Sequence, residues 1–71
     1  MKIENKVEIG KNIRALRKEK KLTQSELANL LYVSQDTISL WELDKSLPDI
    51  PSLVCMSQIF NVTTDYLLNL E

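Results

Sequence analysis

Apolar positions between residues 22 and 42 follow two short helical patterns separated by a turn. Leu27, Ala28 and Leu31 place one apolar face on the first segment. Ala28 is small, so a second helix can cross closely over it. Ile38 and Trp41, three residues apart, give the second segment its buried side. The pattern predicts two amphipathic helices, at about residues 24–31 and 35–43.

Helix-start signals support both segments. Thr23 and Glu26 have the spacing of a capping box, in which a threonine oxygen and a glutamate carboxylate satisfy orphan backbone amides. Leu22 and Leu27 occupy the positions of a hydrophobic staple. Ser34 is a favourable N-cap for the second segment. The unit at about residues 23–42 is therefore well delimited.

Three further helices are predicted outside this unit, at about residues 6–20, from near residue 50 onward, and at about residues 64–69. Asp49 and Thr63 suit the N-cap positions of the last two. The inner faces of the first and fourth helices are expected to carry Ile9, Ile13, Leu16, Leu53, Met56, Ile59 and Phe60. We expect an all-α fold of five helices.

Length and composition limit the alternatives. The chain has 71 residues, 44% of them hydrophobic, which suits a single domain spanning 1–71. Its apolar runs are all shorter than the roughly 20 residues of a membrane helix, and its start lacks a signal-peptide pattern. The single cysteine fits a reducing compartment. These features predict a cytoplasmic protein.

Short polar side chains cover the outward face of the second helix of the unit. This face carries Gln35, Asp36, Thr37, Ser39 and Leu40. A helix of this size, held on top of another, can enter the major groove of DNA, where such side chains can contact base edges.

The spacing of nine residues in this unit resembles that of the XRE family, the phage lambda-type repressors and Cro-like regulators with a helix-turn-helix. The nine are Gln24, Leu27, Ala28, Val33, Ser34, Ile38, Ser39, Trp41 and Glu42. The segments 9–17, 47–49, 59–62 and 65–68 are similar to the other helices of that family. The resemblance covers about residues 9–70, nearly the whole chain, and implies a compact lambda repressor-like fold.

The resemblance also implies roles for individual residues. Base reading would fall to Gln35, Asp36, Thr37 and Leu40. Glutamine can pair with adenine, aspartate can accept from cytosine, and leucine can touch only apolar surface. Phosphate contacts would come from Gln24, with Ser39 and Lys45 as weaker candidates. A structural ion pair is implied between Arg17 and Glu42.

The distribution of charge opposes tight DNA binding. Residues 1–21 carry a net charge of +5, and residues 22–71 carry −6. Lys45 is the only cation between residues 24 and 47, against the four acids Glu26, Asp36, Glu42 and Asp44. Affinity for duplex DNA depends largely on Lys and Arg contacts to phosphates. The basic first segment is read either as a solvated helix whose last turn favours cations or as a phosphate-contacting arm.

The chain departs from the family where glycine is usual. Lys21 and Tyr32 stand at the ends of the first two helices, and the pair 43–44 replaces Asn-Gly after the third. Because glycine adopts positive φ freely, these residues are expected either to strain the turns or to change their path. Asp44 is further expected to put a carboxylate beside the phosphate track.

The C-terminal segment, about residues 59–71, is rich in apolar side chains. Phe60, Tyr66, Leu67 and Leu70 are candidates for a two-fold dimer contact. Cys55 is expected to be partly exposed and to act as an ordinary small apolar residue rather than a redox switch.

Catalysis is not expected, because the chain has no histidine, no Gly-rich phosphate loop and no metal-ligand spacing. No cofactor and no metal are expected. The leading hypothesis is a stand-alone, homodimeric transcriptional regulator, a repressor of bacterial or phage origin, bound to a pseudo-palindromic operator in double-stranded DNA. The alternative is a protein-interaction module on the same scaffold, either an antirepressor or a toxin-neutralising partner.

Overall fold

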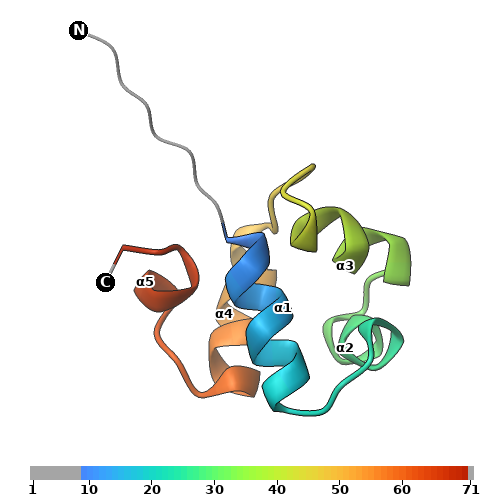
Figure 1. Ribbon diagram of the computed structural model, residues 1–71, viewed down its shortest axis with the longest axis horizontal. Coiled ribbons are helices and arrows are strands. Elements are labelled where there is room, and N and C mark those ends of the chain that lie inside the picture. Colours follow the sequence, from blue (N-terminus) through green and yellow to red (C-terminus); the bar gives the residue numbers. More distant parts are fainter. Residues whose placement is uncertain (1–8, 71) are drawn as a thin grey trace, which may run out of the picture.

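The computed structural model describes residues 9–70, which form five helices and contain no strand (Figure 1). The helices are α1 (Gly10–Glu19), α2 (Gln24–Leu31), α3 (Gln35–Glu42), α4 (Ile50–Phe60) and α5 (Thr64–Leu67). The expected start of the first helix, at residues 6–8, lies outside the described residues. The bounds of α2 match the prediction, whereas α3 ends one residue earlier and α5 ends two residues earlier than expected.

Side-chain caps begin four of the helices, as the sequence predicts. The Thr23 hydroxyl accepts from the amide of Glu26, and the Glu26 carboxylate accepts from the amide of Thr23, so the capping box is complete. Ser34 caps α3, Asp49 caps α4, and Thr63 caps α5 in the same way. These caps satisfy amides that a helix start leaves without an intrahelical acceptor.

Every helix ends on a residue other than glycine in the left-handed region. These residues are Lys21, Tyr32, Asp44, Asn61 and Asn69, with φ between 56° and 65°. At each end the next residue donates its amide to a carbonyl five positions back, for example Val33 to Ala28 at 3.0 Å. This is the hydrogen-bond pattern of the Schellman motif. The usual path of the turns is therefore kept, at the cost of backbone strain at the residues that replace glycine.

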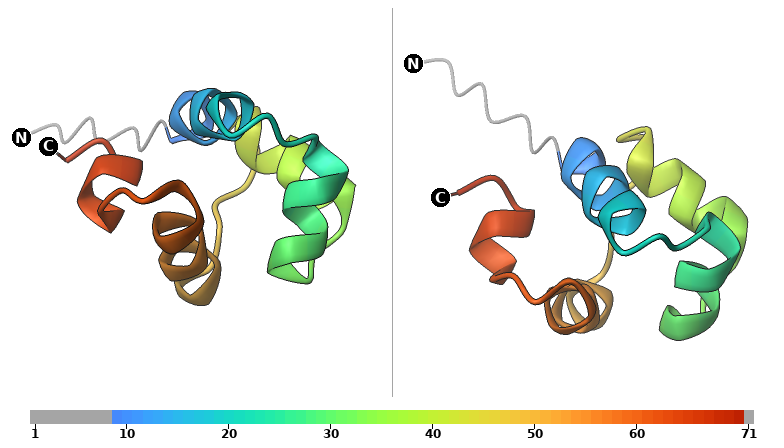
Figure 2. Two further views of the ribbon diagram at one scale, coloured as in Figure 1. Left: turned by 90° about the horizontal axis from the view of Figure 1, so that it is seen from below. Right: turned by 60° about the horizontal axis from the view of Figure 1, so that its bottom comes forward.

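The hydrophobic core lies around α1, which has the α2–α3 pair on one side and α4 and α5 on the other (Figures 1 and 2). Its buried members are Ile9, Ile13, Leu16, Leu27, Ala28, Leu31, Ile38, Trp41, Met56, Phe60 and Leu67. Ala28 is 2% exposed, and its small side chain suits the close crossing of α2 and α3. Leu53 and Ile59 are only partly buried at the edge of this core.

The start of α1 packs directly on the end of α3. A Cβ atom added to Gly10 would lie 2.4 Å from the carbonyl oxygen of Glu42 and 2.7 Å from that of Trp41. No side chain fits at such distances, because both neighbouring atoms belong to backbone. Gly10 thus allows α1 to hold the C-terminal end of α3 in place.

Candidate nucleic-acid interface

A buried ion pair fastens α3 to α1. The Arg17 guanidinium donates through Nε to Glu42 Oε2 at 2.6 Å and through Nη2 to Oε1 at 3.2 Å. Arg17 Nη1 also donates to the carbonyl of Leu22 at 2.8 Å. The two charged side chains are only 11% and 5% exposed. The pair implied by the family resemblance is present, and its two-pronged geometry gives each charge an opposite partner.

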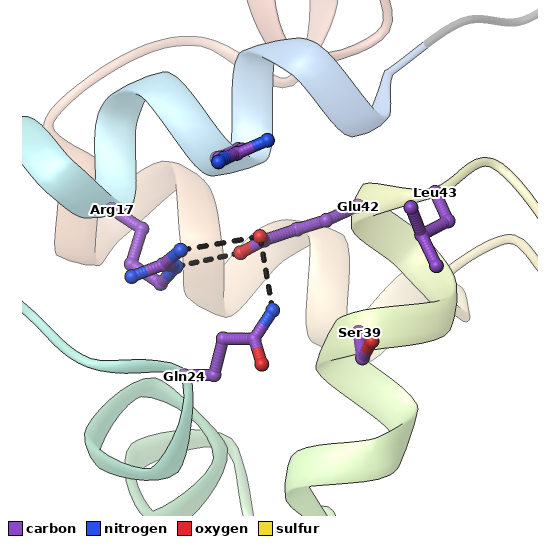
Figure 3. Close-up of a pocket in the computed structure, with 6 residues that line it drawn as sticks. Arg17, Gln24, Ser39, Glu42 and Leu43 are labelled. Atoms are coloured by element: carbon purple, nitrogen blue, oxygen red, sulfur yellow. Dashed lines mark hydrogen bonds and ion pairs between the residues drawn. The ribbon is translucent and has the colours of Figure 1, made fainter.

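Hydrogen bonds connect this pair to the exposed start of α3 (Figure 3 shows the first of them). Gln24 Nε2 donates to Glu42 Oε1 at 3.1 Å, and Gln24 Oε1 accepts from Gln35 Nε2 at 3.5 Å. The Ser25 hydroxyl donates to Gln35 Oε1 at 3.0 Å. The amide of Gln35 is therefore oriented by two residues of α2, one of which is itself bound to the buried pair.

The other predicted base-reading residues differ in how freely they are presented. Gln35, Asp36 and Leu40 are exposed on α3, Leu40 to 42%. Thr37 is half-buried, and its hydroxyl lies 2.8 Å from the hydroxyl of the N-cap Ser34. The Thr37 hydroxyl makes this one hydrogen bond, whereas both amide atoms of Gln35 are engaged, so each side chain keeps part of its hydrogen-bonding capacity.

Two of the three predicted phosphate contacts line one crevice between α1, the start of α2 and the end of α3 (Figure 3). Its volume is about 240 Å³, and its lining residues are Arg14, Arg17, Gln24, Ser39, Glu42 and Leu43. Lys45 is exposed and does not belong to this lining. Arg14 was not among the predicted site residues. It lies three residues before Arg17, on the same face of α1.

The carboxylate of Asp44 caps the start of α1, a contact that the sequence did not predict. Its Oδ1 accepts from the backbone amide of Gly10 at 2.9 Å. Ile9, the N-cap residue of α1, provides no side-chain cap, so Asp44 caps this helix from a distant part of the chain. A helix start favours a negative charge. The expectation that Asp44 puts a carboxylate beside a phosphate track stays a prediction, because the carboxylate keeps its charge while it caps α1.

Hydrogen bonds engage most of the acidic groups of the motif. Glu26 completes its capping box, and the bonds to the Thr23 backbone and side chain hold the pKa of Glu26 below its ordinary value. Glu42 is paired with Arg17, and Asp44 caps α1. Within residues 9–70, Asp36 is the one acid of the motif without such a partner. Of these acids only Glu42 is neutralised by a cation, Arg17, while Glu26 and Asp44 are bound to neutral groups and keep their negative charge.

Only half of the predicted dimer contacts are at the surface. Phe60 and Leu67 are 4% and 0% exposed and belong to the core, so they offer no surface to a second copy and their prediction as contacts is corrected. Tyr66 is 45% exposed and Leu70 is 72% exposed. An apolar sequence segment cannot by itself separate core side chains from surface ones. Glu71, the last residue of the expected segment, lies outside the described residues.

Cys55 is exposed and forms no disulfide. Within the described part of the chain, no three His, Cys, Asp or Glu side chains gather as a metal site would require. Between residues 9 and 70 no helix is long and apolar enough to span a bilayer.

Comparison with known proteins identifies the class to which this geometry belongs. A family model described as a helix-turn-helix domain matches residues 10–71, and the chain belongs to this family. The crystal structure of the P22 c2 repressor protein in complex with a synthetic operator superposes with a TM-score of 0.82. That match is 35% identical in sequence and covers 89% of this chain and 96% of the other. The predicted all-helical, lambda repressor-like fold is thereby confirmed.

Two full-length relatives are informative. The HTH-type transcriptional activator BcrR of Enterococcus faecalis is 46% identical over 65 residues, 92% of this chain and 32% of the relative. Repressor protein C2 of Salmonella phage P22 is 37% identical over 60 residues, 84% of this chain and 28% of the relative. The chain thus spans about a third of the length of these two proteins.

Proposed function

We propose that this chain is a sequence-specific DNA-binding unit of a transcriptional regulator, which inserts α3 into the major groove of its operator. The observation that carries the proposal is the amide of Gln35, exposed on α3 and oriented by Ser25 and Gln24. A glutamine amide aligned in advance can donate to N7 and accept from N6 of one adenine. The operator-bound P22 c2 repressor, which has the same fold, supports this assignment.

The remaining contacts follow from the same docking. Asp36 would accept from a cytosine amino group, and Leu40 would pack on a thymine methyl group. Thr37 would contact a base edge or a thymine methyl group from the first turn of α3. Gln24 and Ser39 would contact phosphates from the crevice beside α3, and Lys45 would do so from the following loop.

A two-fold dimer would suit this mode of binding. Tyr66 and Leu70 are exposed side chains in and just after α5, and α5 lies on the far side of α1 from the α2–α3 pair (Figure 2). Two copies joined there would present two α3 helices to half-sites about one helical turn, or 34 Å, apart. The operator would then be pseudo-palindromic. Because the target is genomic DNA, we place the action of the chain in the cytoplasm.

We further propose that the outcome is repression, through occupation of the operator, as the name of the P22 relative suggests. The name of BcrR states the opposite outcome for that protein. A promoter–reporter fusion carrying the selected operator distinguishes the two: repression lowers expression when the chain is present, and an increase would contradict this part of the proposal.

The base-reading role is tested with Gln35→Ala. We expect altered preference at one base pair of the site, with a melting temperature close to that of the unmodified chain, because Gln35 is exposed. Gln58→Ala, an exposed glutamine on α4, is the matched control and should change neither property. Equal weakening on every duplex, with no change of preference, would contradict direct reading by Gln35.

A second candidate function is a protein-interaction module, either an antirepressor or a toxin-neutralising partner. It is favoured by the exposed apolar side chains near α3 and α4. These include Leu40, Leu43, Leu47, Ile50 and Val54, all between 42% and 75% exposed. Such a module would recover no DNA motif in a binding selection, and it would instead lose partner binding on Leu47→Ser.

A further inference from the structure

The buried ion pair fixes which end of the Gln24 amide faces α3. Glu42 accepts from Arg17 on both carboxylate oxygens, and an ionised carboxylate can only accept hydrogen bonds. Gln24 must therefore turn its amide nitrogen toward Glu42, and Nε2 donates to Oε1 at 3.1 Å (Figure 3). The amide oxygen of Gln24 is left on the other side of the group.

The same polarity passes to Gln35 at the start of α3. The amide oxygen of Gln24 lies 3.5 Å from Nε2 of Gln35, and a carbonyl oxygen accepts only from the nitrogen end of that amide. The oxygen end of Gln35 accepts from the hydroxyl of Ser25 at 3.0 Å. Rotation of the Gln35 amide by 180° would bring two oxygens together at Gln24. The donor and acceptor ends of this exposed amide are therefore fixed by contacts that begin at a buried charge.

One donor and one acceptor of the Gln35 amide remain for a ligand. Nε2 carries two hydrogens and Oε1 has two lone pairs, and each atom uses one of these within the protein. Adenine presents N7 as an acceptor and N6 as a donor in the major groove. The fixed amide matches these two atoms in one sense only, with Oε1 of Gln35 on N6. Guanine would place its O6 acceptor against the same oxygen.

Methylation of that adenine removes the hydrogen on which Oε1 of Gln35 depends. One N6 hydrogen pairs with thymine and the other faces the major groove, so a methyl group that leaves pairing intact takes the position facing Gln35. Oε1 cannot exchange places with Nε2 while Gln24 and Ser25 hold the amide. We infer that N6-methylation of the adenine read by Gln35 releases the chain from its operator, so that binding depends on the methylation state of the DNA. This regulation rests on the proposed function, since the adenine is the one that α3 would read.

The test compares the affinity of operator duplexes with and without N6-methyladenine in one half-site. The base pair at which Gln35→Ala changes preference identifies the adenine to be methylated. The affinity of the unmodified chain should fall by about 5- to 100-fold, which corresponds to leaving one buried acceptor without a donor. Gln35→Ala should bind both duplexes equally, because it has no amide that could lose a partner. N6-methyladenine outside the half-sites is the matched control and should leave the affinity unchanged.

Ser25→Ala tests whether fixed polarity causes the effect. Ser25 is exposed on α2, and its removal leaves the Gln35 amide held only by the 3.5 Å contact to Gln24. The amide can then turn away from the methyl group, so the fold-loss on methylation should be less than half that of the unmodified chain. Asn29→Ala, at another exposed position on α2, is the matched control and should keep the full loss. Both variants should keep the melting temperature of the unmodified chain.

Four results would overturn the inference while DNA binding stands. They are equal affinity for methylated and unmethylated operators, a methylation effect that persists in Gln35→Ala, a full effect in Ser25→Ala, and a selected site without adenine at the position read by Gln35. An unmodified chain that binds no duplex, methylated or unmethylated, would overturn the proposed function and this regulation with it.

Discussion

Replacement of Tyr32 by glycine should stabilise the protein. Tyr32 ends α2 with φ of 57° and ψ of 40°, and its side chain is 95% exposed. A side chain other than glycine in this left-handed conformation costs about 1–2 kcal/mol. Glycine removes that strain but gives the unfolded chain more freedom, which costs about 0.4–1 kcal/mol. The net expected gain in the free energy of unfolding is about 0.5–1 kcal/mol.

Thermal unfolding followed by circular dichroism measures this gain. For a domain of this size, about 1 kcal/mol corresponds to about 4–8 °C, so the melting temperature of Tyr32→Gly should rise by about 3–6 °C. Tyr32→Ala is the matched control. It removes the same exposed ring but keeps the Cβ atom that causes the strain, so it should change the melting temperature little. An equal rise for alanine, or a fall for glycine, would refute the backbone argument.

Three further predictions concern the core and the helix caps. Trp41→Ala should cost about 3–5 kcal/mol in chemical denaturation, because the ring is 4% exposed; an unchanged denaturation midpoint would mean that the ring is not buried. Gly10→Ala should lower the free energy of unfolding by about 1–3 kcal/mol in chemical denaturation, because its Cβ would overlap the Glu42 carbonyl. An unchanged free energy of unfolding would contradict the close packing of α1 on α3. The lowered pKa of Glu26 gives stability that is present above its ordinary value of 4.5 and lost as pH falls through the lower folded pKa. Glu26→Gln should therefore flatten the acid limb of a plot of melting temperature against pH, and an identical limb would contradict the capping role.

The sequence was most informative where local chemistry decides the structure. The caps at Thr23, Ser34, Asp49 and Thr63 lie where side-chain oxygen and spacing predict them, because a cap involves only residues within one turn. The buried faces of α2 and α3 likewise follow from apolar spacing. The Arg17–Glu42 pair required a family resemblance, because its members are 25 residues apart.

Contacts between distant segments were not predictable in the same way. Nothing local indicates that Asp44 caps α1, since that bond depends on the approach of α1 to α3 at Gly10. The crevice at Arg14 depends on three helices meeting. The choice between core and surface for Tyr66, Leu67 and Leu70 also depends on tertiary packing, because α5 is a single short turn whose sequence pattern is too brief to define a face.

The central claim is that α3 reads base sequence in duplex DNA. Selection of random duplexes against the purified chain, at low and at physiological salt, tests it most directly. The account predicts recovery of a pseudo-palindromic site, with a salt slope that indicates several phosphate contacts on each copy. Recovery of no motif at either salt would contradict the claim and would favour a protein partner as the ligand of this fold.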